Sequence, residues 1–421
     1  MRAPLWAIGS FIGYLMWLGT GKWPLIMTIR RGAVFITNLR IQWITLRNAQ
    51  RARGVEGPLT IQLLGSRDDL VSPADNIDLV SGSQFVYLDV PESSHSSIID
   101  MTGTGAPAQR RRAFQRALTR SKSELEAEAV IPSDDALREP ELGVTDVVFV
   151  MHGIRDEGYW THKIARKVRI LGRSTGRVWA TETSSYGYFA MLPFLLSARR
   201  RQKVEWMMDQ YAEALARYPN ARFHYVGHSN GTYLLAKALQ LYRACQFSRV
   251  VFAGSVVACR YNWADPFKRG QVEAVLNCIA TGDWVVAFFP RMFEVVPVQD
   301  LGSAGHDGFK PEGQAGLTKL AFVRGGHGAA IQEKLWNAIA HFITTGALGT
   351  QVPADALTGP RSWWVVLLGW WPPIIWLSIT ALLVGLWFGI NAIATTLSGP
   401  WAAGFASALF AFLILLALRR I

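Results

Sequence analysis

The chain of 421 residues carries 43 lysines and arginines against 31 aspartates and glutamates, a net charge of +12, and half of its residues are hydrophobic. This length allows one large domain or two modest ones. The three cysteines, Cys245, Cys259 and Cys278, are odd in number and lie in apolar segments, which argues against a disulfide framework.

An apolar run opens the sequence. Between Leu5 and Ile29 only Lys22 is charged, which predicts a membrane segment over residues 1–29 that this lysine shortens. Basic residues follow the run, in a juxtamembrane region over 30–57, and do not precede it. The order therefore differs from that of a signal peptide.

A second apolar region closes the sequence. No residue is charged from Trp363 to Leu418, and Pro400 divides this region into runs over 374–397 and 401–418. About 20 helical residues cross a hydrocarbon core, so each run is long enough to span. The sequence predicts a C-terminal transmembrane hairpin over 363–418. The alternative is a buried hairpin within a large soluble core.

The basic residues beside these runs predict an orientation. Positive charge marks the cytoplasmic side of a membrane, and Arg30, Arg361 and Arg419 all flank apolar runs. We therefore expect an integral membrane protein whose region 30–362 is cytoplasmic. The remaining basic cluster, over 110–122, contains few aromatic residues, so attraction to anionic lipid explains the basic residues at least as well as nucleic-acid binding does, and we expect no nucleic-acid partner.

Residues 102–143 are polar, with a basic block followed by an acidic block. They predict a linker with one exposed helix around 109–128. After it, short apolar runs alternate with helical stretches up to about residue 348. This alternation predicts a mostly parallel sheet with helices on both faces. The strands are expected over 145–153, 177–185, 221–229, 248–257, 273–283 and 317–327, and the main helices over 162–172, 204–219, 232–244 and 328–346.

One glycine-rich turn contains the candidate nucleophile. The segment YVGHSNGTYLLAKAL begins at residue 225 and contains the pattern Gly227-His228-Ser229-Asn230-Gly231 directly after a predicted strand and before a predicted helix. A sharp strand–turn–helix at this place projects the serine beyond the carboxyl end of the sheet, where ligands bind in open α/β folds. Side chains at the two glycines would collide with the neighbouring strand and helix. The context favours a nucleophilic serine over a turn of no chemical interest.

Here the sequence resembles the α/β-hydrolase superfamily over about residues 145–345, and GHSNG is similar to the nucleophile elbow of lipases and esterases. The resemblance implies a catalytic domain over 144–348, with the chain order nucleophile, acid, histidine. Asp283, in ATGDWVV after a strand, takes the family's acid position, with Asp265 as its rival. His327, in RGGHGAA after the last strand, is the expected base, with His306 as its rival. We expect structural roles for three other histidines, His162, His224 and His341.

The roles follow from the chemistry of a serine nucleophile. His327 would remove the proton of Ser229, and Asp283 would orient the imidazole. The backbone N–H of Asn230, at a helix start, is one expected oxyanion donor. The segment MHGIRD resembles the family's His-Gly oxyanion motif, which implies the N–H of Ile154 as the second donor. Gly153 would permit the turn, and His152 would order the loop.

Two further segments leave alternatives open. Residues 186–203 combine an apolar half with a basic half, and they predict either a cap that touches the membrane or a core helix with a solvated end. Residues 58–101 resemble the acid–histidine end of another hydrolase domain, with Asp69 and His95 in those places. This partial unit is either a remnant of a duplicated hydrolase or an accidental match, and a truncated gene would give the same picture.

The sequence thus predicts a membrane-anchored serine hydrolase, similar to carboxylesterases and lipases, acting on a lipid or acyl ester or thioester without metal or cofactor. The same triad would serve a peptidase or an acyltransferase. A non-catalytic membrane scaffold that retains the fold is the alternative of another class. No CxxC pair or ligand-spaced histidines indicate a metal site.

Overall fold

The computed structural model describes residues 28, 32–55, 57–68, 85–130, 140–156, 158–357 and 359–420. Two compact units divide the chain. Unit 1 comprises Met1–Gly143 with Met208–Asn220, and unit 2 comprises Val144–Met207 with Ala221–Ile421. The predicted membrane segment over 1–29 lies outside the described residues except for Thr28.

Unit 2 is built on a parallel sheet of six strands in the order β4-β3-β5-β6-β7-β8. The strands are short apolar runs, and the central ones are buried on both faces, as parallel strands covered by helices must be. This confirms the parallel α/β architecture expected from the sequence. The strands are β3 (Asp146–Met151), β4 (Trp179–Glu182), β5 (Arg222–His228), β6 (Arg249–Ala253), β7 (Ala274–Ala280) and β8 (Leu317–Val323).

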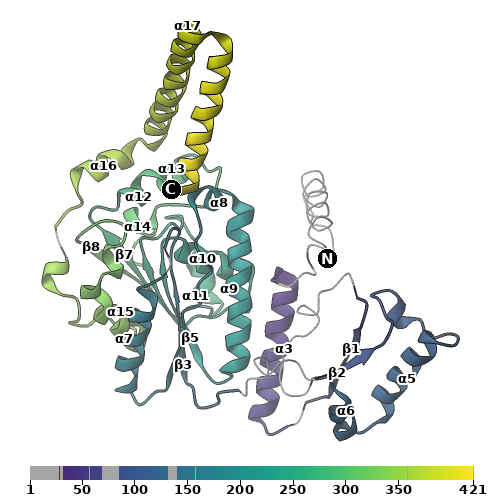
Figure 1. Cartoon of the computed structure of the whole chain (residues 1–421). Helices are drawn as coiled ribbons and strands as arrows, with labels where there is room; N and C mark the ends of the chain where they lie inside the picture. The colour runs from purple at the N-terminus through teal and green to yellow at the C-terminus, as the bar shows by residue number, and fades with distance from the viewer. Residues whose placement is uncertain are drawn as a thin grey trace. The chain divides into compact units, whose positions relative to one another are not determined.

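Helices cover both faces of this sheet (Figure 1). On one face α7 (Thr161–Arg173) and α15 (Glu333–Thr345) pack on alternate strand residues in one apolar cluster. On the other face α10 (Asn230–Leu241) contacts β5, and α14 (Ala304–Asp307) contacts β7. The remaining helices of unit 2 are α8 (Met191–Leu195), α9 (Ser197–Arg217, which continues into unit 1), α11 (Ala264–Lys268), α12 (Trp284–Phe288), α13 (Pro290–Val295), α16 (Trp363–Trp370), α17 (Pro372–Arg420) and the short η4 (Ala329–Ile331) and η5 (Ala354–Ala356).

The strand order creates a switch point between β3 and β5. The chain leaves β3 toward β4 on one side and returns to β5 on the other. In open α/β sheets, ligands bind beyond the carboxyl ends of the strands at such a point. The register aligns these ends, because Met151 pairs with Gly227, His228 with Ala253, and Ala253 with Cys278. The loops that follow the strands therefore meet along one edge.

Aromatic side chains fill the face of the sheet opposite α7 and α15. Phe149 is fully buried, and its ring lies 5.9 Å from that of Phe223 and 5.5 Å from that of Phe247. Tyr225 packs edge-on against Phe247 at 5.3 Å. These rings hold β3 and β5, the two strands of the switch point, against the segment before β6.

Truncating this cluster is expected to destabilise the protein without touching the site. Phe149→Ala should lower the free energy of unfolding by about 3–5 kcal/mol, because it leaves a ring-sized cavity in a packed core. Denaturant unfolding of the detergent-solubilised chain, followed by tryptophan fluorescence, measures the change. Ile170→Ala, at an exposed position of α7, is the matched control and should change the transition little. Equal midpoints for the two variants would contradict this view of the core.

Helix α17 is the one helix in the described part of the chain that is long and apolar enough to cross a membrane. It consists of two arms that meet at a kink, since Gly399 has φ 81° and ψ −178° directly before Pro400. Figure 1 shows the arms side by side, and Trp387 Nε1 of one arm donates to Ser407 Oγ of the other at 3.2 Å. Its large apolar side chains are exposed, so the hairpin is not a buried core element.

Unit 1 contains two parallel strands, β1 (Thr60–Gly65) and β2 (Phe85–Val90), preceded by helix α3 (Val34–Ala52). After the short η2 (Ser97–Ile99), the segment expected to be a linker forms α5 (Ala106–Thr119) and α6 (Lys122–Glu128), both in contact with β2. This segment folds because it contains a few apolar residues among its polar ones: Leu125 of α6 packs on Val86 and Leu88.

Candidate active site

Ser229 stands at the sharp turn between β5 and α10. Its backbone has φ 52° and ψ −118°, a conformation that is costly for a residue with a side chain and that persists at functional sites. The elbow fits closely against its neighbours. A Cβ on Gly231 would lie 2.6 Å from the carbonyl oxygen of Met151, and one on Gly227 would lie 2.9 Å from the carbonyl carbon of Gly231. Both glycines are therefore required by close backbone approach.

Asp283 follows β7 and caps the next helix. Its Oδ1 accepts a hydrogen bond from the N–H of Val286 at 3.0 Å, so it is the N-cap of α12. His327 follows β8, and its Nδ1 lies 3.1 Å from both carboxylate oxygens of Asp283. The Asp283 side chain is completely buried, and the His327 side chain is 19% exposed. The structure thus brings the predicted acid and base together, with Nε2 of the histidine turned away from the acid.

The electrostatics suit a base. Burial disfavours the charged form of His327, but the charge and hydrogen bond of Asp283 outweigh it and raise the pKa of His327 above its ordinary value. Burial alone would raise the pKa of Asp283, yet His327 and the Val286 N–H lower it below its ordinary value. The neighbouring His228 behaves oppositely, because burial and the nearby His327 lower its pKa to about 3. At neutral pH, the imidazole of His228 is therefore uncharged where it packs beside His327.

Ser229 lies on the same edge as this pair. Its N–H donates to the carbonyl oxygen of Ala253 at 3.0 Å, and a Cβ on the next residue, Gly254, would lie 2.8 Å from the His327 ring. Within the described ranges, no hydrogen bond of 3.5 Å or less joins Ser229 Oγ to His327. Catalytic hydrogen bonds are often longer than this before substrate binds. Gly254, with φ 54°, was not singled out from the sequence, and it leaves the space that the imidazole occupies.

The loop after β3 faces the serine. A Cβ on Gly153 would lie 2.7 Å from Cβ of Ser229, so only glycine lets this loop come so close. The N–H of Arg155 is engaged by the carbonyl oxygen of Phe189 at 3.1 Å. Among the described residues, the N–H of Ile154 makes no hydrogen bond, and Asn230 begins α10, where N–H groups have no intrahelical partner. Both expected oxyanion donors are therefore available.

Tyr186 joins this loop to the elbow, and sequence reasoning missed it. The carbonyl oxygens of His152 and Gly153 lie 2.7 and 2.9 Å from its hydroxyl and share its one proton, and the hydroxyl oxygen accepts from Nδ2 of Asn230 at 3.1 Å. Its ring stacks on that of His152 at 4.3 Å. Burial raises the pKa of Tyr186 well above its ordinary value, so the hydroxyl keeps its proton and remains a donor. No local motif in the sequence marks this tyrosine.

The rival residues have other partners. His306 is buried on α14, where its Nδ1 lies 3.1 Å from Asp307 and 3.1 Å from Nη1 of Arg291. Asp265 is an exposed residue of α11 that pairs with Arg269. The histidines expected to be structural also bind elsewhere: His224 Nε2 to Asp146, His162 Nδ1 to Thr183, and His341 Nδ1 to the carbonyl oxygen of Ala347.

The segment over 186–203 differs from the expectation of a solvated basic end at one residue, Arg200 of α9. Helix α8 contacts α17, while Arg200, in the half expected to be solvated, is completely buried. Arg200 donates to the Phe194 carbonyl oxygen and to Asp300 at 2.6 Å each. The arginine therefore anchors the segment to the body of unit 2.

Unit 1 also contains an aspartate–histidine contact. Asp69, the predicted acid, lies outside the described residues, but the preceding Asp68 has its Oδ2 3.3 Å from Nδ1 of His95. The backbone around it repeats that of unit 2. Ser66 and Arg67 donate to the end of β2 and the loop after it, as Thr281 and Gly282 donate to the end of β8 and the loop after it. In both units a short 3-10 helix begins two residues after the histidine.

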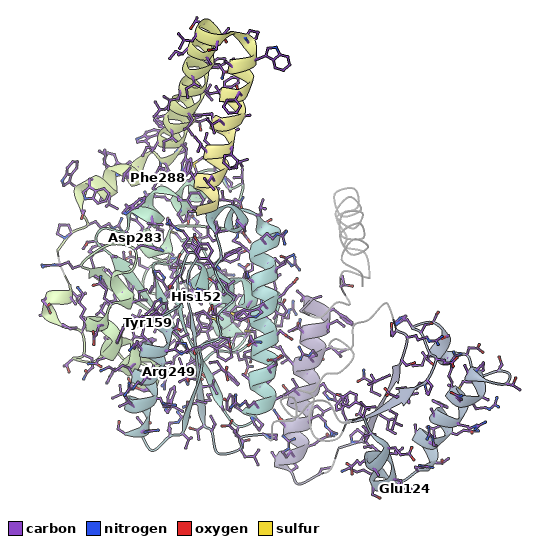
Figure 2. All side chains as sticks on the ribbon, viewed as in Figure 1. Glu124, His152, Tyr159, Arg249, Asp283 and Phe288 are labelled. Carbon is purple, nitrogen blue, oxygen red and sulfur yellow. The ribbon has the colours of Figure 1, made fainter. Side chains whose placement is uncertain are left out.

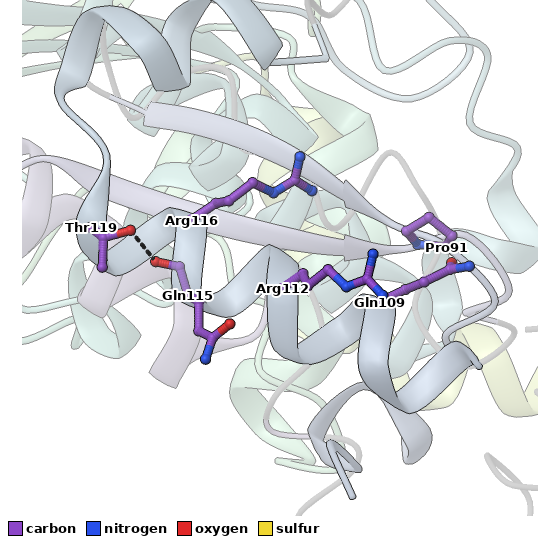
Figure 3. A pocket seen from close by; sticks show the side chains of 6 residues that line it. All are labelled: Pro91, Gln109, Arg112, Gln115, Arg116 and Thr119. Atoms are coloured by element: carbon purple, nitrogen blue, oxygen red, sulfur yellow. Dashed lines mark hydrogen bonds between the residues drawn. The ribbon is translucent and has the colours of Figure 1, made fainter. Parts of the chain in front are cut away.

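An open pocket of about 460 Å³ lies elsewhere in unit 1 (Figure 3). Arg112, Gln115 and Arg116 of α5 line it, together with Gln109, Thr119 and Pro91. Arg116 is already paired with Glu128 at 3.1 Å. None of these six residues is a histidine or a carboxylate, so they provide no acid–base pair for hydrolysis.

No protein-family model matches the sequence, and a search of curated proteins finds no match. Among solved structures, the chain is similar to the crystal structure of LpqC, a poly(3-hydroxybutyrate) depolymerase from Bordetella parapertussis, with 14% sequence identity and a TM-score of 0.31. The match covers 54% of this chain and 84% of the depolymerase. A likeness at this score carries no conclusion about activity. The chain is an α/β protein with a parallel sheet, and its function has to be inferred from its own residues.

Proposed function

We propose that the chain is a membrane-anchored serine hydrolase, with unit 2 adopting the α/β-hydrolase fold, that cleaves an ester or thioester of a lipid or acyl substrate. The observation that carries the proposal is the contact of His327 Nδ1 with both oxygens of buried Asp283, on the same sheet edge as the strained Ser229 turn. A nucleophile, a base with a raised pKa and an orienting acid are the parts that acyl transfer needs.

The reaction proceeds in two steps. Ser229 Oγ bonds to the substrate carbonyl carbon while His327 Nε2 takes its proton, and the carbonyl electron pair moves to oxygen. The N–H groups of Ile154 and Asn230 stabilise this oxyanion. Its collapse expels the alcohol or thiol, which takes the proton from His327 and leaves an acyl-enzyme. Water then repeats the sequence and releases the acid.

Anchoring is supported by α17. Its exposed apolar arms would meet lipid, and residues 363–371 supply tryptophans suited to the membrane–water interface. The basic residues beside the apolar runs support a cytoplasmic position for unit 2. A peptidase or acyltransferase would use the same triad, and only the substrate separates these activities from esterase activity.

The test is covalent trapping. The full chain in its membrane fraction is treated with a fluorophosphonate, which reacts with activated serines, and digested for mass spectrometry. We expect the phosphonyl adduct on the peptide that contains Ser229. A panel of acyl esters of increasing chain length, presented in vesicles, then identifies the substrate class. If the folded chain forms no adduct at Ser229, the hydrolase proposal fails and the scaffold alternative takes its place.

A further inference from the structure

We propose that the C-terminal hairpin positions the acid of the site, so that Trp376 is a positioning residue and hydrolysis depends on how the hairpin is seated. This inference rests on the proposed function and adds a control of the same site. It starts from the shortness of α12, the helix that Asp283 caps. Only five residues, Trp284–Phe288, separate the acid from the end of that helix.

The far end of α12 rests on the hairpin. The ring of Phe288 stacks on that of Trp376 with centroids 4.9 Å apart and planes at 15°. The ring of the next residue, Phe289, lies edge-on to the same indole, with centroids 5.7 Å apart. Trp376 lies one turn into α17, at the base of its first arm. In Figure 2, Phe288 and Asp283 lie toward the end of unit 2 from which the hairpin extends, and Arg249 lies toward the opposite end.

The chain before the hairpin holds the other side of the same turn. The N–H of Ser362, directly before α16, donates to the carbonyl oxygen of Thr281 at 3.0 Å, two residues before Asp283. Helix α16 itself contacts α12. The turn that carries the acid is thus held before Asp283 by Ser362 and after it by Trp376.

The histidine loop is held by the same segment. The N–H of Arg324, three residues before His327, donates to the carbonyl oxygen of Ala356 at 2.9 Å, and Val323 forms an antiparallel bridge with Leu357. Residues 354–357 and Ser362 therefore contact the loops of both the acid and the base before the chain enters the hairpin. A displacement of the first turn of the hairpin would therefore move both partners of the Asp283–His327 contact.

The physical consequence is that the orientation and the pKa of His327 depend on the position of the hairpin. Asp283 raises the pKa of His327 only while the carboxylate faces Nδ1. A displaced α12 would move the carboxylate, misorient the imidazole and let its pKa fall. Because displacements of about 1 Å at a reacting group can cost about 100-fold in rate, a rigid support for this turn matters.

The experiment compares fluorophosphonate labelling rates of full-length Trp376→Ala, Trp376→Phe and Trp401→Ala in vesicles across pH. Trp376→Ala should label Ser229 about tenfold more slowly, within the cost of small displacements. The acid limb of its pH profile should move to lower pH, because His327 loses the influence of Asp283. Trp376→Phe keeps a ring against Phe288 and should restore both properties. Trp401, 93% exposed after the kink, is the matched control and should behave as the native chain.

Three outcomes would overturn the inference. They are an unchanged rate in Trp376→Ala, a slower rate with an unmoved acid limb, and an equal effect of Trp401→Ala. If Trp376→Ala does not fold, Phe288→Leu removes the same stacking from the other side and is read by the same two criteria. Failure of the native chain to label at Ser229 would refute the proposed function itself, so the two failures are distinguishable.

Discussion

Replacing Ser229 by alanine is expected to reduce ester hydrolysis by about 10⁴-fold or more, because no acyl-enzyme can form without the hydroxyl. Alanine keeps the Cβ that faces Gly153 and adds no atom to the elbow. The fold and the positive-φ turn should therefore persist. The measurement is the initial rate of acyl-ester cleavage by the purified full chain in vesicles, with folding checked by its thermal unfolding transition.

Ser255 provides the matched control for this variant. It also follows a strand of the same sheet, two residues after β6, but its Oγ accepts from the N–H of Val257 at 3.3 Å and its side chain is buried. Ser255→Ala should retain most of the hydrolysis. If Ser229→Ala hydrolyses esters as fast as the native chain, the nucleophile lies elsewhere and the assignment of the elbow is wrong.

Asp283→Asn is expected to reduce hydrolysis by about 10²–10⁴-fold while leaving the fold intact. Asparagine remains a good N-cap for α12, so the helix should be retained. Its amide can donate to Nδ1 of His327, which favours the tautomer with the proton on Nε2. In that tautomer Nε2 cannot accept the proton of Ser229.

The same variant should change the pH dependence in a defined direction. The base works when it is neutral, so activity falls as the pH drops through the pKa of His327. In the native chain Asp283 raises this pKa, and the loss begins at a higher pH than for an unpaired histidine, whose ordinary value is about 6.5. Without the carboxylate, the residual activity of Asp283→Asn should persist to lower pH.

Asp265→Asn is the control for the acid, since this residue is the rival by position in the sequence and pairs with Arg269 on the surface. It should leave both the rate and the profile unchanged. If Asp265→Asn carries the loss and Asp283→Asn does not, the acid has been assigned to the wrong loop.

The parts of the site that could be predicted are those encoded locally. The alternation of apolar runs gives the strands, and the carboxyl ends of parallel strands must share an edge, so Ser229, Asp283 and His327 could be expected there. The choice of Asp283 over Asp265 rested on the resemblance. In the structure its contact with His327 depends on the register of β7 and β8, which no single segment contains.

Other features depend on which distant loops meet. Tyr186 contributes through three contacts to residues 33–44 positions away, and nothing near it in the sequence signals them. The polar composition of 102–143 predicts a linker, yet Leu125 of α6 lies in one apolar cluster with Val86 and Leu88 of β2. In unit 1, Asp68 contacts His95, whereas the sequence pattern pointed to Asp69, because two adjacent aspartates in a turn differ only in the direction that the backbone gives to their side chains.

The contact of Asp68 with His95 places an aspartate against a histidine in unit 1 with the same order of strands and turns as in unit 2. Two parallel strands and the two turns that follow them orient the pair in unit 1, where no Gly-x-Ser-x-Gly precedes it in the sequence. A gene segment that encodes such a pair could be copied without its nucleophile and still fold into the same stereochemistry. Within the described residues, this arrangement of an aspartate and a histidine after two neighbouring parallel strands occurs twice, at Asp68 with His95 and at Asp283 with His327.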